Sequence, residues 1–270
     1  MTSATEPWTF AGESPTLNGA RPLVTLVEET SFCLSTGAVD IHAGSPHGLF
    51  FLDTRFLSAL VLRVDGELVE SLAVANDVPF AATFFGRVRR TDGGREEGSL
   101  VVFRRRHIGR GLVERIELRN YGPNPARATV ALDVDADFAD LFAVKEGRST
   151  RAHPGRWECD ERVMRIGGAD QHADRSVAVR FSQPGEITPG RARWDVELPP
   201  HGAWEVCVEV VASLGDVEIE PRHRCGAPVE TSRPVQRLHA WQAAMPVIST
   251  DAPALEQAVR RASEDLVALR

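Results

Sequence analysis

Alternation of apolar and polar residues between Ser99 and Val134 is the feature that most constrains the fold of this chain. Over 112–119, one side of an expected strand is apolar and the other charged: Leu112, Ile116 and Leu118 against Arg115, Glu117 and Arg119. After a strong turn at Tyr121–Pro125, the pattern resumes from Ala128 to Val134. Alternation with a period of two indicates a strand that has one face buried and the other exposed to solvent, as in an antiparallel sheet. Three such strands joined by short turns predict a meander.

The same pattern continues downstream and predicts the fold class. Strands are expected over 177–181, 194–198 and 204–211, and Pro199–Gly202 suits a hairpin connection between the last two. Strands do not alternate with helices before residue 215, which disfavours a doubly wound fold. The sequence therefore predicts a mainly β protein, a large antiparallel β-sandwich followed by a C-terminal helical linker.

Changes in composition and in the hydrophobic pattern divide the chain into three segments. Residues 1–22 predict a flexible lead-in rich in Gly and Pro, 23–215 the β-sandwich domain, and 216–270 the helical linker. Near the end, apolar residues recur at helical spacing behind a capping Asp251 and Pro253: Leu255, Val259, Ala262, Leu266 and Leu269. Such a stripe must pack on something, so this helix folds back on the sandwich or opens a second domain. The pattern favours the second arrangement.

Charge and composition exclude several classes of function. A formal charge of -7 and a pI near 5.7 do not suit a nucleic-acid partner. We expect no signal peptide, and no membrane partner because no run approaches the ~18 apolar residues of a spanning helix. The four cysteines are Cys33, Cys159, Cys207 and Cys225. Two disulfides are conceivable, but the scattered spacing favours reduced thiols and a cytoplasmic location.

Three carboxylates within Val134–Phe142 are the first candidates for chemistry. In a strand, Asp135 and Asp137 would point to the same side, roughly 6.6 Å apart. Such a pair could supply the acid and base of a glycoside hydrolase. Asp is also favoured at strand ends and turns for its local hydrogen bonds, and this structural interpretation is preferred for Asp135, Asp137 and Asp140. A calcium site has little support because no EF-hand spacing follows.

Asp53 and Arg55 are charges embedded in an apolar run, Leu49–Leu57. Residues two apart share a face of a strand, so an Asp53–Arg55 ion pair is expected, one costly to break if buried. We prefer a structural pair that sets strand register over a charge aimed at a sugar hydroxyl or a neighbouring domain.

No cofactor and no metal site are predicted. The eight histidines match no zinc spacing, and the glycine pairs do not open a helix after a strand, as a phosphate loop would. Arg104–His107 is a basic patch that alternation divides between two faces. We therefore expect no complete active site within this chain.

The segment Gly48–Ser58, GLFFLDTRFLS, resembles a stretch near the start of bacterial glycogen-debranching-enzyme-like proteins, the amylo-α-1,6-glucosidase group. Gly111–Gly122 is similar to the family's Glu-Arg strand, and Asp135–Arg148 to its acidic strand-end motif. Ala262–Arg270 looks like the helix that leads into the catalytic domain. The order and spacing of the four segments agree with the family over about residues 24–270.

This resemblance implies a division of labour. The N-terminal part of such proteins is a β-sandwich, and a C-terminal catalytic barrel of α-helices supplies the acid and base carboxylates. That barrel, in the same or a separate chain, is the implied partner, with α-glucan as a second one. No catalytic residue is carried over. Signature positions that would meet substrate or the barrel are Asp53, Arg55, Asp137 and Asp140. Ala143 stands where an acidic residue is usual, so a contact made by that acid would be missing.

We therefore predict an N-terminal, non-catalytic domain of a glycogen-debranching glycoside hydrolase, bracing the barrel and lining its α-glucan cleft. One alternative is a free-standing carbohydrate-binding module that stacks sugars on Trp157, Trp194 or Trp204. The other is a structural or oligomerisation unit.

Overall fold

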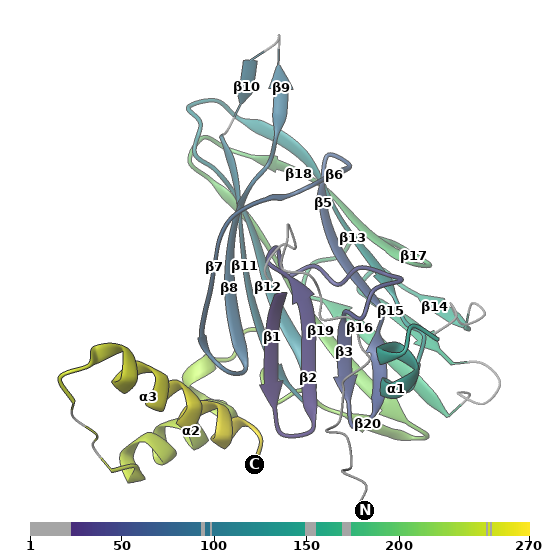
Figure 1. Ribbon diagram of the computed structural model, residues 1–270. Helices are drawn as coiled ribbons and strands as arrows, with labels where there is room; N and C mark the ends of the chain where they lie inside the picture. The colour runs from purple at the N-terminus through teal and green to yellow at the C-terminus, as the bar shows by residue number, and fades with distance from the viewer. Residues whose placement is uncertain are drawn as a thin grey trace, which may run out of the picture.

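The computed structural model describes residues 23–92, 95–97, 99–148, 155–168, 174–246, 248 and 250–270. The expected lead-in, residues 1–22, lies outside the described residues. Antiparallel strands form two facing layers, and the two longest helices lie near the C-terminus, away from a short helix over 141–145 (Figure 1). The prediction of a mainly β sandwich with a C-terminal helical region is confirmed.

One layer is a sheet of nine of the described strands, in the order β14-β15-β16-β19-β12-β11-β8-β7, with β20 paired to β19. Its members are β7 (Glu70–Val78), β8 (Ala81–Arg87), β11 (Leu100–Gly109), β12 (Gly111–Asn120), β14 (Trp157–Cys159), β15 (Val163–Gly167), β16 (Arg175–Phe181), β19 (Ala203–Leu214) and β20 (Val217–Ile219). Through β20 the sheet extends past the domain boundary expected at residue 215.

The facing layer joins two smaller sheets, β17-β18-β13-β5-β6 and β1-β2-β3-β4. The first contains β5 (Ala59–Val64), β6 (Glu67–Leu68), β13 (Ala126–Asp135), β17 (Glu186–Thr188) and β18 (Arg191–Leu198). The second contains β1 (Leu23–Glu28), β2 (Ser31–Thr36), β3 (Gly48–Phe51) and β4 (Thr54–Leu57). A separate hairpin pairs β9 (Arg90–Asp92) with β10 (Arg95–Glu97).

The meander expected over 99–134 is only partly correct. β11 pairs with β12 as expected, but β12 then pairs with β19, while β13 pairs with β5 and β18 in the facing layer. The turn at Tyr121–Pro125 thus carries the chain across the sandwich. Strands of both layers bury one face, so alternation alone cannot tell the two layers apart.

Four charged side chains lie buried between the layers. Arg104 Nε donates to Glu114 Oε1 at 2.5 Å, and its Nη1 donates to Asp40 Oδ1 at 2.6 Å. Arg106 Nε donates to the second carboxylate oxygen of Glu114 at 2.7 Å. Alternation therefore does divide the Arg104–His107 patch, and it turns the two even-numbered arginines into the core. Burial alone would raise the pKa of Glu114, but the two guanidinium groups outweigh burial and hold it below its ordinary value.

The C-terminal segment forms η2 (Val229–Thr231), α2 (Arg233–Ala244) and α3 (Pro253–Ala268). The end of α3 folds back on the sandwich, where Glu29 N donates to Ala268 O, as one of the two expected arrangements has it. A second domain beyond this helix stays a prediction. The face of α3 that packs inward carries Glu264, Val267 and Ala268. The expected stripe instead leaves Leu255, Leu266 and Leu269 exposed. Within the described residues, no helix is long and apolar enough to cross a bilayer.

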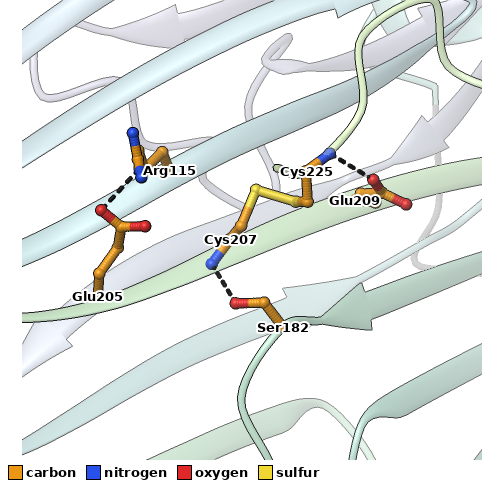
Figure 2. The surroundings of a disulfide bond; sticks show 6 residues. All are labelled: Arg115, Ser182, Glu205, Cys207, Glu209 and Cys225. Carbon is orange, nitrogen blue, oxygen red and sulfur yellow. Dashed lines mark hydrogen bonds and ion pairs between the residues drawn. A yellow bond between two sulfur atoms is a disulfide. The ribbon is translucent and has the colours of Figure 1, made fainter. Parts of the chain in front are cut away.

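Cys207 and Cys225 form a disulfide, which corrects the expectation of reduced thiols for this pair (Figure 2). Glu209 on β19 accepts a hydrogen bond from Cys225 N at 2.6 Å, so the loop before η2 is tied to the large sheet twice. A cross-link over 18 residues stabilises a fold by about 3 kcal/mol through the entropy of the unfolded chain. Cys33 is a buried free thiol and Cys159 an exposed one. The cytoplasmic location stays a prediction.

Candidate functional site

Two of the segments that the sequence analysis singled out, Gly48–Ser58 and Asp135–Arg148, are neighbours in space. β5 and β13 pair up to Ala59 and Asp135, and Ser58 N then donates to Asp135 O at 2.9 Å. Beyond this point, Arg55 N donates to Ala139 O and Leu141 N to Asp53 O, each at 2.9 Å. The segments are therefore the two sides of one antiparallel seam, although they are far apart in sequence.

The buried part of this seam is an ion pair between Arg55 and Asp137. Arg55 Nε donates to Asp137 Oδ1 at 3.0 Å, and Nη2 contacts Oδ2. Nη1 donates to the carbonyls of Ser45 at 2.9 Å and His47 at 3.1 Å. Both side chains are buried, and a bidentate guanidinium–carboxylate pair has fixed geometry, so it locks the seam in register.

The expected Asp53–Arg55 pair is wrong. Asp53 belongs to the turn between β3 and β4 rather than to a strand, so the rule that residues two apart share a face does not apply. Asp53 is exposed, whereas Arg55 points into the seam toward Asp137. Leu52, in the same turn, adopts a positive φ of 51°, which is uncommon for a residue other than glycine.

Gly48 is required by the close approach of the arginine. A Cβ added at Gly48 would lie 2.5 Å from Cδ of Arg55 and 2.9 Å from the carbonyl oxygen of Leu57. Any larger residue would displace either the guanidinium or the backbone of β4. The glycine at the start of the GLFFLDTRFLS segment thus has a packing reason.

The clustered aspartates make local hydrogen bonds, as the structural interpretation expects. Asp135 accepts from Ala136 N at 2.9 Å, and Asp137 accepts weakly from Ala139 N at 3.3 Å. Asp140 caps α1 (Leu141–Lys145) by accepting from its second residue at 2.8 Å. Because Asp137 is committed to Arg55, this cluster is not an acid–base pair.

The four signature residues therefore divide into two kinds. Arg55 and Asp137 are buried within the seam, whereas Asp53 and Asp140 are exposed at its end. Two large exposed residues are close to these aspartates in sequence: Leu52 directly precedes Asp53, and Phe142 is two residues after Asp140. We call these four exposed residues, Leu52, Asp53, Asp140 and Phe142, the seam tip. In Figure 1, α1 marks its position beside β3 and β4. Ala143, where an acid was expected, is half-buried in α1.

Sequence reasoning missed a contact between His107 and His223. Their rings lie 4.9 Å apart, at the joint between β11 and the loop that precedes η2. His223 is 4% exposed. Burial lowers the pKa of each imidazole to about 4. The positive charge of Arg105 lowers the pKa of His107 further, while Glu230 acts in the opposite direction. The pKa of His223 is also lowered by the neighbouring His107. No sequence signal could pair two histidines so far apart.

Acid is expected to loosen this joint. Between pH 6.5 and about 4 the unfolded chain protonates both histidines while the folded chain does not, so the free energy of unfolding falls as pH is lowered. The slope is at most about 1.4 kcal/mol per pH unit for each histidine. Urea unfolding measured from pH 7 to 4.5 should show a flatter pH dependence for His107→Phe/His223→Phe than for the native chain. His201→Phe is the control, and equal slopes in all three proteins would contradict the assignment.

The part of the chain that the structure describes contains no group of three His, Cys, Asp or Glu side chains that could hold a metal ion. The aspartates of the seam make structural contacts, and the seam ends in an exposed tip.

The comparison with protein families gives one match. The family model described as the N-terminal domain of (some) glycogen debranching enzymes matches residues 26–209. This range contains both sides of the seam and most strands of the sandwich. None of the curated proteins matches the chain.

Solved structures with a similar arrangement are only distantly related. A putative kojibiose phosphorylase from human microbiome is 7% identical over 90% of this chain, with a TM-score of 0.44. A galactose mutarotase-like protein from Clostridium acetobutylicum is 6% identical over 71% of this chain and 95% of its own, with a TM-score of 0.42. This chain spans 35% of the phosphorylase.

Proposed function

The chain belongs to the family formed by the N-terminal domains of some glycogen debranching enzymes, and on this premise we propose a non-catalytic role for it. It is a β-sandwich domain of an amylo-α-1,6-glucosidase-like glycoside hydrolase. It braces a catalytic barrel of α-helices, in the same or a separate chain, and lines part of the α-glucan cleft.

The observation that carries this proposal is the exposed apolar stripe of α3. Leu255, Leu266 and Leu269 are 55%, 60% and 64% exposed, although their spacing places them along one side of the helix. Burying a leucine side chain yields about 1.5–3 kcal/mol, so a row of three exposed ones favours a second surface that covers them. A following domain is the covering surface we propose.

The seam tip supports the same conclusion at a second place. Leu52 and Phe142 are exposed beside Asp53 and Asp140, on a backbone held by the Arg55–Asp137 pair. A rigid edge with apolar and acidic groups suits contact with a barrel or with sugar hydroxyls. This assigns the exposed signature residues to contact and the buried ones to support.

The first test is the reading frame beyond codon 270. Several hundred residues with helical periodicity are expected there, or in a neighbouring gene. The 270-residue chain alone should release no glucose from glycogen limit dextrin. Clear release by this chain would contradict a non-catalytic role.

The second test is a pair of variants in the assembled enzyme. Leu266→Asp/Leu269→Asp should lower debranching activity at least tenfold or weaken assembly, because two charges replace buried leucines at the proposed interface. Val217→Asp, at an exposed valine on β20, is the control and should have no effect. Unchanged activity and assembly in the double variant would argue against the bracing role. Self-association of the isolated chain through this stripe, abolished by the same variant, would favour an oligomerisation unit instead.

A further inference from the structure

Two tryptophans, one from each layer of the sandwich, are in contact at a place apart from the seam. Trp194 on β18 and Trp204 on β19 have ring centroids 5.7 Å apart, and Phe181 on β16 lies 5.3 Å behind Trp194. Trp194 is 5% exposed, whereas Trp204 is only half-buried. The pair thus seals the core with one ring and offers part of the other to solvent.

The tryptophans line a hollow of about 310 Å³ whose other walls include polar side chains. Gln183, Glu186, Arg193 and Asp195 lie around it. A second hollow, of about 470 Å³, shares Asp195 and Val196 with the first, so the two adjoin along β18. Pockets of 300–1,000 Å³ with aromatic walls and a few polar groups are typical ligand sites.

The charges beside the tryptophans indicate a neutral ligand with hydroxyl groups. Trp194 itself is held by the loop, because a Cβ at Gly185 would lie 2.5 Å from its buried Nε1 atom and only glycine lets the loop approach the indole. Arg193 pairs with Asp195 at 3.0 Å and faces Glu186 at 3.6 Å, which leaves these three charges with a net charge of -1. That balance disfavours a phosphate and suits a neutral polyol.

We propose that the two adjoining hollows bind a short stretch of an α-glucan chain outside the catalytic cleft. The C–H face of one glucose ring would pack on Trp204, and its hydroxyl groups would bond to Glu186, Arg193 and Asp195. The neighbouring glucose would occupy the second hollow. The choice of α-glucan over another neutral sugar rests on the proposed function, while the aromatic and polar walls rest on the structure alone.

Isothermal titration of the 270-residue chain with maltoheptaose tests this site. We expect binding that Trp204→Ala weakens at least tenfold. The matched control is Trp157→Ala, which removes another half-buried tryptophan, on the edge strand β14, and should leave the affinity unchanged. Because Trp204 also contacts the core, a second variant, Glu186→Ala, changes only an exposed side chain and should weaken binding several-fold with an unchanged Tm.

Several results would overturn the proposal. One is the absence of heat at millimolar maltoheptaose, and another is full affinity in both Trp204→Ala and Glu186→Ala. Equal affinity for cellohexaose would contradict the assignment to α-glucans. None of these results would affect the bracing role, which is tested by activity and assembly in the Leu266→Asp/Leu269→Asp variant.

Discussion

Glu114→Gln is expected to lower the free energy of unfolding by about 3–5 kcal/mol, the cost of breaking a buried ion pair from one side. The Glu114 carboxylate is fully buried and contacts both Arg104 and Arg106, each of which is also buried. A neutral amide would leave Arg106 without a carboxylate partner, and Arg104 with only Asp40. Urea unfolding followed by circular dichroism at pH 7 would measure the change.

The matched control for this prediction lies on the same strand. Glu117→Gln removes a carboxylate that pairs with Arg119 on the outer face of β12, where solvent screens the charges. Its expected cost is below about 1 kcal/mol. If both variants unfolded at the same urea concentration as the native chain, the buried network would not contribute to stability.

Asp137→Ala is expected to lower the free energy of unfolding by a similar amount, about 3–5 kcal/mol, because it leaves the Arg55 guanidinium buried without its carboxylate. The carbonyl groups of Ser45 and His47 would remain among its acceptors. Thermal and urea unfolding would show the loss. Since the seam also holds the seam tip in place, the proposed bracing role predicts that an assembled enzyme would lose activity together with stability.

Asp53→Ala tests whether Arg55 pairs with Asp137, as in the structure, or with Asp53, as expected from the sequence. Asp53 is exposed, so its removal should change the free energy of unfolding by less than about 0.5 kcal/mol. If Asp53→Ala strongly lowered the free energy of unfolding and Asp137→Ala did not, the result would support the Asp53–Arg55 pair instead. A double variant, Arg55→Met/Asp137→Leu, should be more stable than either single variant, because no uncompensated charge remains buried.

Local patterns predicted much of the fold. Period-two alternation located β11, β12, β13, β18 and β19, and helical spacing located α3. The alternation also divided Arg104–His107 between two faces, as observed. These predictions succeed because the buried face of a strand or helix depends on neighbours within a few residues.

Contacts between distant segments could not be read in the same way. Arg55 and Asp137 are 82 residues apart, and Arg104 and Asp40 are 64 apart. Cys207 and Cys225 are one of several possible pairings of four cysteines, which spacing does not distinguish. Each of these contacts depends on which strands the chain brings together.

The candidate site shows the same division. The resemblance to a family drew attention to Asp53, Arg55, Asp137 and Asp140, but their roles follow from burial. Two of them are inside the seam and two are at its tip, because a turn at Leu52–Asp53 interrupts the strand. Strand periodicity holds only while the strand continues, and one turn reverses which side chains face the core.

By itself, then, the sequence determined the sandwich class, most of its strands and the two segments that form the seam. The alternation and composition of each segment determine which of its side chains can be buried. Only the tertiary structure decided that those segments pair with each other, that Arg55 binds Asp137, and that the leucines of α3 remain exposed. Pairing across many residues is selected by how whole layers fit together, and that fit is a property of the assembled chain.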